Sequence, residues 1–256
     1  MLVAHLTDSH LDCTDTTRDR IRRVAGELAA ATKRVDVIVV TGDTVEGSAF
    51  DDTASMVEEY RLVHDLLAPL APVTYCPGNS DGEAFDLFLN EVFPEGEGAN
   101  RRVEANGVTI LTLDSRIRGD FAGHLGDETI AWLDATLAGA SGPVVIAMHH
   151  PPVTIGHRAF DRLRLDNPEA LEAVIGRYPN VVGILCGHIH MALATRFGEV
   201  DLAVAQGIHS SGSLPWVLDD DPTSLIDPTA PPAFSMHHVD ASGLTSFPVV
   251  LREDDV

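Results

Sequence analysis

The run Leu2-Val3-Ala4-His5-Leu6-Thr7-Asp8-Ser9-His10 joins an apolar segment of strand length to two residues that commonly bind metal ions. In an extended chain, side chains two positions apart lie on the same side, so Asp8 and His10 can face one centre. Four later segments share this design, in which a short apolar run ends in polar residues. These are Val35–Val40 before Thr41-Gly42-Asp43, Thr74–Cys76 before Pro77-Gly78-Asn79-Ser80-Asp81, Val144–Met148 before His149-His150-Pro151-Pro152, and Val181–Cys186 before Gly187-His188-Ile189-His190.

Amphipathic segments separate these predicted strands, to which Val108–Leu113 adds one more. Four segments carry apolar residues at the spacing of one helical face, namely Thr17–Thr32, Ala54–Leu67, Glu128–Leu137 and Pro168–Arg177. Strands that alternate with helices predict an α/β fold. In an open α/β sheet, ligands bind beyond the carboxyl ends of the strands, so the five polar strand ends can meet in one crevice.

The helical period fades after Met191. Strand-like segments then follow at Leu193–Phe197, Val200–Ala205, Phe234–Val239 and Leu244–Leu251, which suggests a second, more antiparallel sheet. We interpret Asp219–Pro232, rich in Asp and Pro, as a surface loop and Glu253–Asp255 as a solvated tail. We therefore predict one domain over residues 1–256, in which residues 206–256 form a C-terminal strand and loop segment that packs on the core.

Each polar strand end has a simpler explanation when it is taken alone. Asp-x-His at a strand end is common in turns and helix caps, and Gly-Asp or Gly-Asn is ordinary turn chemistry. Five such sites in order, each at the end of an apolar strand, are hard to obtain from turns, and together they predict a metal site. Gly42, Gly78 and Gly187 agree with this prediction, because glycine lets backbone pass close to a crowded centre or adopt a positive φ.

Composition excludes several classes of protein. The 256 residues include 17 basic and 39 acidic side chains, a net charge of -22, which disfavours duplex nucleic acid as a partner. The apolar runs fall far short of the roughly 20 residues that a membrane helix needs, and the first residues show no cleavable leader, so we expect a protein without a membrane partner. Cys13, Cys76 and Cys186 are odd in number and widely spaced, which favours a reducing cytoplasm over a disulfide framework.

The motifs resemble the signature of the calcineurin-like metallophosphoesterases, which comprises Asp-x-His, Gly-Asp, Gly-Asn-His-Asp/Glu, His-x-Pro and Gly-His-x-His. Matching motifs run from Leu2 to His190. Three further elements resemble the class III cyclic nucleotide phosphodiesterase and glycerophosphodiesterase branch: His149-His-Pro-Pro, Leu113-Asp114-Ser115, and Gly123-x-Leu125 followed by Ile130-x-Trp132-Leu133. The resemblance implies a four-layer αββα sandwich of two mixed sheets flanked by helices, two adjacent metal ions and hydrolysis of a phosphoester.

The resemblance also assigns the metal ligands by position. It places Asp8, His10 and His190 on one metal ion, Asn79, His149 and His188 on the other, and Asp43 on both. Imidazole, carboxylate and amide ligands without thiolate suit two divalent or trivalent ions of Mn, Fe or Zn rather than a structural zinc cage. Two such ions about 3.5–4 Å apart would clamp the attacking hydroxide and the phosphate oxygens. Their positive charge would also attract an anionic substrate to an otherwise acidic protein.

Ser80 departs from the family pattern, in which a histidine that assists the transition state or the leaving group usually follows the ligand asparagine. A serine hydroxyl can donate a hydrogen bond to a phosphate oxygen, but it is a poor proton donor at neutral pH. Without a substitute, the loss of a general acid would lower the rate about 10²–10⁴-fold for poor leaving groups. The candidate substitutes are His150, His157 and His209, while Asp81 is expected to orient or cap.

The predicted catalytic residues are thus Asp43, Asn79, Ser80 and His150. The favoured function is hydrolysis of a small phosphodiester, such as a 3′,5′- or 2′,3′-cyclic nucleotide, by metal-activated hydroxide. A glycerophosphodiesterase, or a phosphodiesterase or phosphatase of broad specificity, would use the same site. The alternative from another class is a catalytically weak metal-binding scaffold, and Ser80 in place of the family histidine is the feature that would favour it. The family also suggests a homodimer. We interpret His5 and His64 as structural, and His237 and His238 have no partner visible in the sequence.

Overall fold

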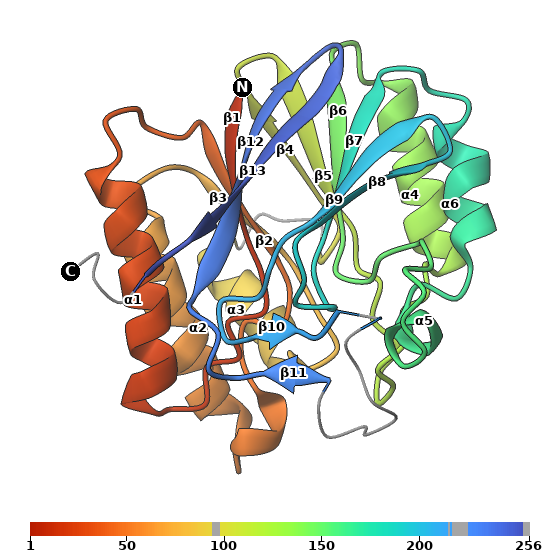
Figure 1. Cartoon of the computed structure of the whole chain (residues 1–256). Helices are drawn as coiled ribbons and strands as arrows, with labels where there is room; N and C mark the ends of the chain where they lie inside the picture. Colours follow the sequence, from red (N-terminus) through yellow and green to blue (C-terminus); the bar gives the residue numbers. More distant parts are fainter. Residues whose placement is uncertain (94–97, 215, 217–224, 253–256) are drawn as a thin grey trace.

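The computed structural model describes residues 1–93, 98–214, 216 and 225–252, and it contains two large sheets that lie face to face (Figure 1). The first sheet has the order β13-β12-β1-β2-β3, and the second has the order β4-β5-β6-β7-β9-β8. The strands of the first sheet are β13 (Gly243–Val250), β12 (Ala233–Asp240), β1 (Leu2–Leu6), β2 (Val37–Thr41) and β3 (Val73–Cys76). Those of the second are β4 (Arg101–Ala105), β5 (Val108–Thr112), β6 (Val144–Ala147), β7 (Val181–Cys186), β9 (Val200–Val204) and β8 (Leu193–Phe197).

Helices cover the outer face of each sheet. In Figure 1 the first sheet carries α1 (Asp15–Ala30), α2 (Thr53–Leu67) and α3 (Ala84–Val92), while the second carries α4 (Asp127–Ala138) and α6 (Pro168–Ile175). Short elements complete the chain: η1 (Gly47–Ala49), α5 (Phe160–Leu163) and the two-stranded pair β10 (Ser211–Gly212) and β11 (Ile226–Asp227). The molecule is an αββα sandwich of two mixed sheets, as the sequence motifs implied.

The core has three apolar layers, because strand side chains alternate between the two faces of a sheet. Ala4 and Leu6 of β1 point toward α1 and α2, whereas Val3 of the same strand points toward the second sheet. A similar apolar layer lies beneath α4 and α6. Buried parallel strands carry apolar residues on both faces, which explains why the strand segments in the sequence are continuous apolar runs.

The sequence-based prediction for the strands after Met191 is wrong in one respect. These strands do not form a second sheet of their own. β8 and β9 extend the sheet of β5 to β7, with β9 parallel to β7, while β12 pairs antiparallel with β1 and β13 pairs with β12. The sequence of a strand does not specify which strand it pairs with. β propensity reflects only how well the side chains fit a half-buried sheet surface.

Three other expectations concern the ends and the cysteines. The expected tail Glu253–Asp255 lies outside the described residues, and so does part of the expected loop Asp219–Pro232, whose later part contains β11. The three cysteines are free, as the spacing suggested. Among the described residues, no helix combines the length and apolarity that crossing a bilayer requires.

The two sheets approach closely where β7 lacks a side chain. A Cβ built on Gly183 would lie 2.6 Å from Cγ of Leu244, a β13 residue that packs into the layer between the sheets. Leu244 therefore occupies the space that any other residue at position 183 would fill. The C-terminal hairpin β12–β13 thus packs against the second sheet while it is hydrogen-bonded to the first.

We expect Gly183→Ala to destabilise the protein by about 1–3 kcal/mol, because the added methyl group overpacks this contact. Leu244→Ala removes the clashing group, so the double variant should lose less free energy of unfolding than the sum of the two single losses. Urea denaturation of the four proteins measures this coupling. Strictly additive losses would show that the contact between these two residues does not limit the packing of the sheets.

Candidate metal centre

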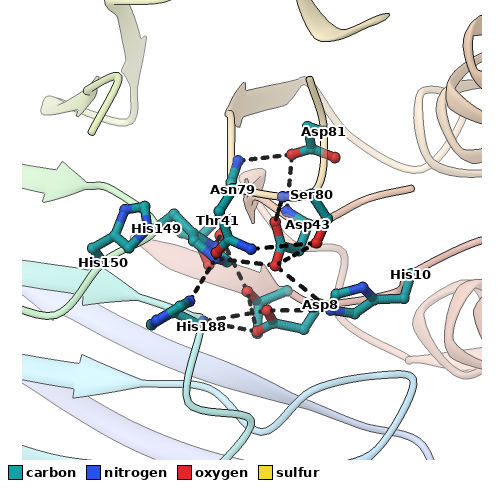
Figure 2. Close-up of polar contacts among 12 residues, drawn as sticks. Asp8, His10, Thr41, Asp43, Asn79, Ser80, Asp81, His149, His150 and His188 are labelled. Atoms are coloured by element: carbon teal, nitrogen blue, oxygen red, sulfur yellow. Dashed lines mark hydrogen bonds and ion pairs between the residues drawn. The ribbon is translucent and has the colours of Figure 1, made fainter. Parts of the chain in front are cut away.

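Side chains from five strand ends converge at one edge of the sandwich, and Figure 2 shows Asp8, His10, Asp43, Asn79, His149 and His188 among them. Asp8 and His10 follow β1, Asp43 follows β2 and Asn79 follows β3, all in the first sheet. His149 follows β6 and the pair His188 and His190 follows β7, in the second sheet. β1 to β3 are parallel to one another, as are β6 and β7, so their carboxyl ends meet at this edge. The predicted convergence of the five strand ends is present in the structure.

One group of donors surrounds His190. Its Nε2 lies 3.3 Å from Oδ1 of Asp8 and 3.2 Å from Nε2 of His10. The same His10 nitrogen lies 3.6 Å from Oδ2 of Asp43. Asp8, His10 and His190 each offer a donor atom within 4.8 Å of the others, so this trio could hold a metal ion.

A second group surrounds His149 on the other side of Asp43. Nε2 of His149 lies 3.3 Å from Oδ2 of Asp43, 3.2 Å from Oδ1 of Asn79 and 3.2 Å from Nδ1 of His188. Asp43 Oδ2 is therefore close to imidazole nitrogens of both groups. Asp8, Asp43 and His149 also meet the distance condition for a metal ion. The carboxylate of Asp43 lies between two sets of donors, as a bridging ligand would.

The outer ring nitrogens of three histidines each have a hydrogen-bonding partner. Nδ1 of His149 lies 2.7 Å from the carbonyl oxygen of Thr41, Nδ1 of His10 lies 2.9 Å from Oε2 of Glu46, and Nδ1 of His190 lies 2.7 Å from Oγ of Ser210. A carbonyl or carboxylate oxygen only accepts hydrogen bonds, so Nδ1 of His149 and of His10 carries the proton. The Nε2 lone pairs then face the centre, which is how metal-binding histidines are usually held. The donor set fits metal ions on this observation.

Electrostatic interactions within the cluster are strong because it is buried. Burial opposes protonation of His10 and His149, yet hydrogen bonds and charges from neighbouring carboxylates outweigh it and raise the pKa of each to about 9. Burial opposes ionisation of Asp8 and Asp43, but nearby histidines lower both pKa values, that of Asp8 to about 2. Because Nδ1 of His10 and His149 is already engaged, the extra proton sits on Nε2. A metal ion takes the place of such protons and releases them on binding.

The backbone at this edge is left-handed at five of the candidate ligands. The φ angles are 52° at Asp8, 41° at His10, 49° at Asp43, 72° at His188 and 54° at His190. Few residues other than glycine adopt positive φ, and clusters of such residues mark functional sites at a cost of order 1–3 kcal/mol each. The turns thus direct the side chains inward at the expense of local stability. The extended backbone assumed for Asp8 and His10 in the sequence is therefore wrong, although Asp and His are among the residues other than glycine that adopt positive φ most readily.

Asp81 ties two of these turns together. Its buried carboxylate accepts backbone N–H groups of Asp43 at 2.9 Å, Thr44 at 2.8 Å and Val45 at 3.2 Å, and that of Gly78 at 2.7 Å. Burial and the Asp43 carboxylate raise the pKa of Asp81 to about 6, against the lowering effect of the Tyr60 hydroxyl and of the backbone N–H groups of Gly78 and Val45. Asp81 thus has the orienting role expected for it, because its carboxylate links the turns after β2 and β3.

The predicted catalytic residues other than the ligands lie in different surroundings. The backbone N–H of Ser80 donates to Oδ1 of Asp43 at 2.8 Å, and its hydroxyl lies 3.3 Å from Nδ2 of Asn79. His150 is fully buried, with Nδ1 2.8 Å from Oγ of Ser115, and Figure 2 shows its ring on the outer side of the cluster, away from Asp8. Its ring centroid lies 4.7 Å from that of His188, so it packs against a candidate ligand.

The two remaining candidate substitutes for the family histidine, His157 and His209, lie in different parts of the structure. Nδ1 of His157 accepts the backbone N–H groups of Ala159 and Phe160 at the start of α5, which is a capping role. The ring of His209 lies 5.6 Å from the ring of His10, at the metal centre itself. Sequence reasoning missed Glu46 and Ser210, the partners of the candidate ligands His10 and His190. The position of Ser210 beside His209 was the available signal for one of them, and nothing distinguished Glu46 from other acidic residues.

Two facing mixed sheets with a histidine and carboxylate cluster at their shared edge define a metallophosphatase fold. A dimetal phosphatase from Danio rerio has a similar fold, with a TM-score of 0.68 at 14% identity and 98% of each chain covered. Residues 1–192 match the family described as calcineurin-like phosphoesterase, and the chain belongs to this family.

Two named relatives are similar over most of the chain. The glycerophosphodiester phosphodiesterase GpdQ of Enterobacter lignolyticus is 30% identical, with 93% of this chain and 86% of the relative covered. A 3′,5′-cyclic-nucleotide phosphodiesterase of a Nostoc species is 32% identical, with 73% of this chain and 71% of the relative covered. These similarities agree with the class III branch that the sequence motifs indicated.

We expect Asp81→Asn to lower the free energy of unfolding by about 2–4 kcal/mol, since the amide would present an NH₂ group to backbone N–H donors and leave some unsatisfied. Asp51→Asn, at an exposed carboxylate, serves as the control. Urea denaturation in the presence of a chelator measures the effect on the turns alone. An unfolding midpoint equal to that of the control would show that Asp81 does not hold these turns together.

Proposed function

We propose that this protein is a dinuclear-metal phosphodiesterase that hydrolyses a small phosphodiester. The observation that carries the proposal is the position of Asp43, whose Oδ2 lies 3.6 Å from His10 and 3.3 Å from His149. One carboxylate between two separate histidine groups suits a pair of ions more than a single one. Family membership and the names of the two relatives support the same reaction class.

The proposed ligand sets follow the two groups of donors. Asp8, His10 and His190 hold one ion, Asn79, His149 and His188 hold the other, and Asp43 binds both. Nitrogen and oxygen donors without thiolate suit Mn, Fe or Zn. When bound, the two ions would lower the pKa of water and stabilise negative charge on the phosphate oxygens.

The remaining residues of the site act on the substrate and on the ligands. Ser80 can donate its hydroxyl to a phosphate oxygen from a position beside Asn79. Of the candidate substitutes for the family histidine, His209 lies on the side of the first donor group, with its ring 5.6 Å from that of His10. Burial and the neighbouring His10 lower the pKa of His209 to about 4, so at pH 7 its neutral ring can donate a hydrogen bond but has no imidazolium proton for the leaving oxygen, and the site lacks the general acid of the family. We retain His150 as the wall of the site behind His149 and His188.

The favoured substrate is a cyclic nucleotide, and the alternative is a glycerophosphodiester. The Nostoc relative supports the first and the Enterobacter relative the second. The net charge of -22 disfavours a long polyanion such as duplex nucleic acid. The three free cysteines favour a reducing cytoplasm as the place of action. A homodimer stays a prediction from the family resemblance.

We expect the protein loaded with Mn²⁺ to hydrolyse bis-p-nitrophenyl phosphate faster than p-nitrophenyl phosphate, and to lose both activities when a chelator removes the metal. Asp43→Asn should lower the diester rate by orders of magnitude without unfolding the protein, whereas Asp127→Asn, at an exposed position of α4, should not. Release of p-nitrophenolate measures the rates. A preference for the monoester would make the protein a phosphatase, and bound metal without either activity would favour the scaffold hypothesis.

We further expect Ser80→His to raise kcat about 10²-fold for diesters with poor alkoxide leaving groups, because an imidazolium can protonate the departing oxygen. Diesters that release p-nitrophenolate should change little, since this leaving group does not need a proton. Ser141→His, in an exposed loop far along the chain, controls for an added imidazole. Equal changes for both classes of diester would contradict a role for position 80 in protonating the leaving group.

A further inference from the structure

A chain of polar side chains crosses the first sheet inside the apolar layer between the two sheets. Nε2 of His5 in β1 lies 2.8 Å from Oγ1 of Thr41 in β2. Nδ1 of His5 lies 3.2 Å from Nε2 of His237 in β12, and Nδ1 of His237 lies 2.8 Å from Oγ of Ser246 in β13. This chain of polar side chains therefore links the neighbouring strands β2, β1, β12 and β13, in addition to the backbone hydrogen bonds between them.

The two histidines of this chain are costly to bury. Both are fully buried, and they lie beside apolar residues of the inter-sheet layer such as Val3 and Val39. Burial lowers the pKa of His5 far below its ordinary value and that of His237 to about 4. Both imidazoles are thus neutral, and each ring nitrogen has a partner. A pair of apolar side chains would fill this space without any need for partners, so the polar chain calls for a role beyond packing.

The chain of polar side chains ends at Thr41, the residue that orients His149. The carbonyl oxygen of Thr41 accepts the Nδ1 proton of His149 at 2.7 Å, and it also accepts the hydroxyl of Thr7 at 3.2 Å. Thr41 is separated from Asp43 by Gly42 alone. The hydroxyl and the carbonyl of one residue therefore join the buried chain to the second donor group of the site.

We propose that His5 and His237 are positioning residues of the metal centre. They hold Thr41 through its hydroxyl, so that the Thr41 carbonyl keeps Nε2 of His149 directed at its ion. Through Ser246 they make the C-terminal hairpin β12–β13, which lies beyond the family match at residues 1–192, part of the support of that ion. The inference rests on the proposed function, because it requires that the site bind two ions.

The test measures Mn²⁺ binding to the chelator-treated full-length protein by isothermal titration calorimetry, with the bound metal counted by mass spectrometry. We expect His5→Phe to weaken one of the two binding steps by up to about 10-fold and to leave the other step unchanged, because His5 acts through Thr41 and so has a smaller effect than the roughly 10–100-fold of a direct partner of a metal ligand. His5→Gln, which can donate and accept, should restore part of the loss. His237→Phe should weaken the same step by a smaller factor.

Val39→Ala is the matched control. Val39 pairs in register with His5 in the sheet and is buried in the same apolar layer, but it belongs to no polar chain. Its truncation should lower thermal stability and leave both Mn²⁺ affinities as in the wild type. Should His5→Phe fail to fold, Ser246→Ala removes only the distal hydroxyl and should still weaken the same binding step measurably.

Each outcome of the titration decides the proposal. If His5→Phe binds two Mn²⁺ ions as tightly as the wild type, or if both steps weaken equally and in parallel with Val39→Ala, the histidines are structural and the proposal is wrong. A Ser246→Ala protein with both wild-type affinities would likewise separate the hairpin from the site. If the wild type binds no Mn²⁺, the proposed function itself fails, which is distinct from loss of coupling in a wild type that binds two ions.

Discussion

A single buried carboxylate, that of Asp81, holds together the turns from which Asp43 and Asn79 project. The turns after β2 and β3 leave the sheet while still buried, so their backbone N–H groups need acceptors other than a neighbouring strand. Asp81 supplies both of its oxygens to four of these groups. Gly78 completes the close packing, because a Cβ there would contact the carboxylate of Asp43. The carboxylate between the two donor groups therefore has one defined position relative to the amide of Asn79.

The sequence predicted the parts of the fold that follow from periodicity and strand ends. Leu2–Leu6 was predicted with the bounds that the structure has, and Ala54–Leu67 differs from α2 by one residue. The metal-ligand types could be recognised because each follows an apolar run, and parallel strands bring their carboxyl ends to one edge of a sheet. The calcineurin-like signature added the ligand sets. The local pattern of residues and the direction of the strands were together enough to predict that these side chains meet at one edge.

What could not be predicted depends on contacts between distant segments. β12 pairs with β1 across more than 200 residues of sequence, and nothing in Phe234–Val239 specifies that neighbour. For the same reason His237 had no visible partner, although it is the hydrogen-bonding partner of His5. The left-handed backbone at His188 and His190 was equally hidden, because φ depends on the turn that the surrounding structure imposes and not on residue type alone. Long-range pairing and local strain are therefore the two components that the pattern of residues leaves open.

The acidic surface repels anions, whereas the proposed site must attract an anionic substrate. The two effects are compatible because they act over different distances. Repulsion from a net charge of -22 acts on any polyanion that must lie across the surface, where it makes contact with many carboxylates. A small diester interacts mainly with the edge of the sandwich, and at physiological salt charges beyond about 8 Å are largely screened. Two ions beside Asp8 and Asp43 would dominate the field within that range. A charge distribution that repels a long polyanion is thus compatible with a small anionic substrate at the edge of the sandwich.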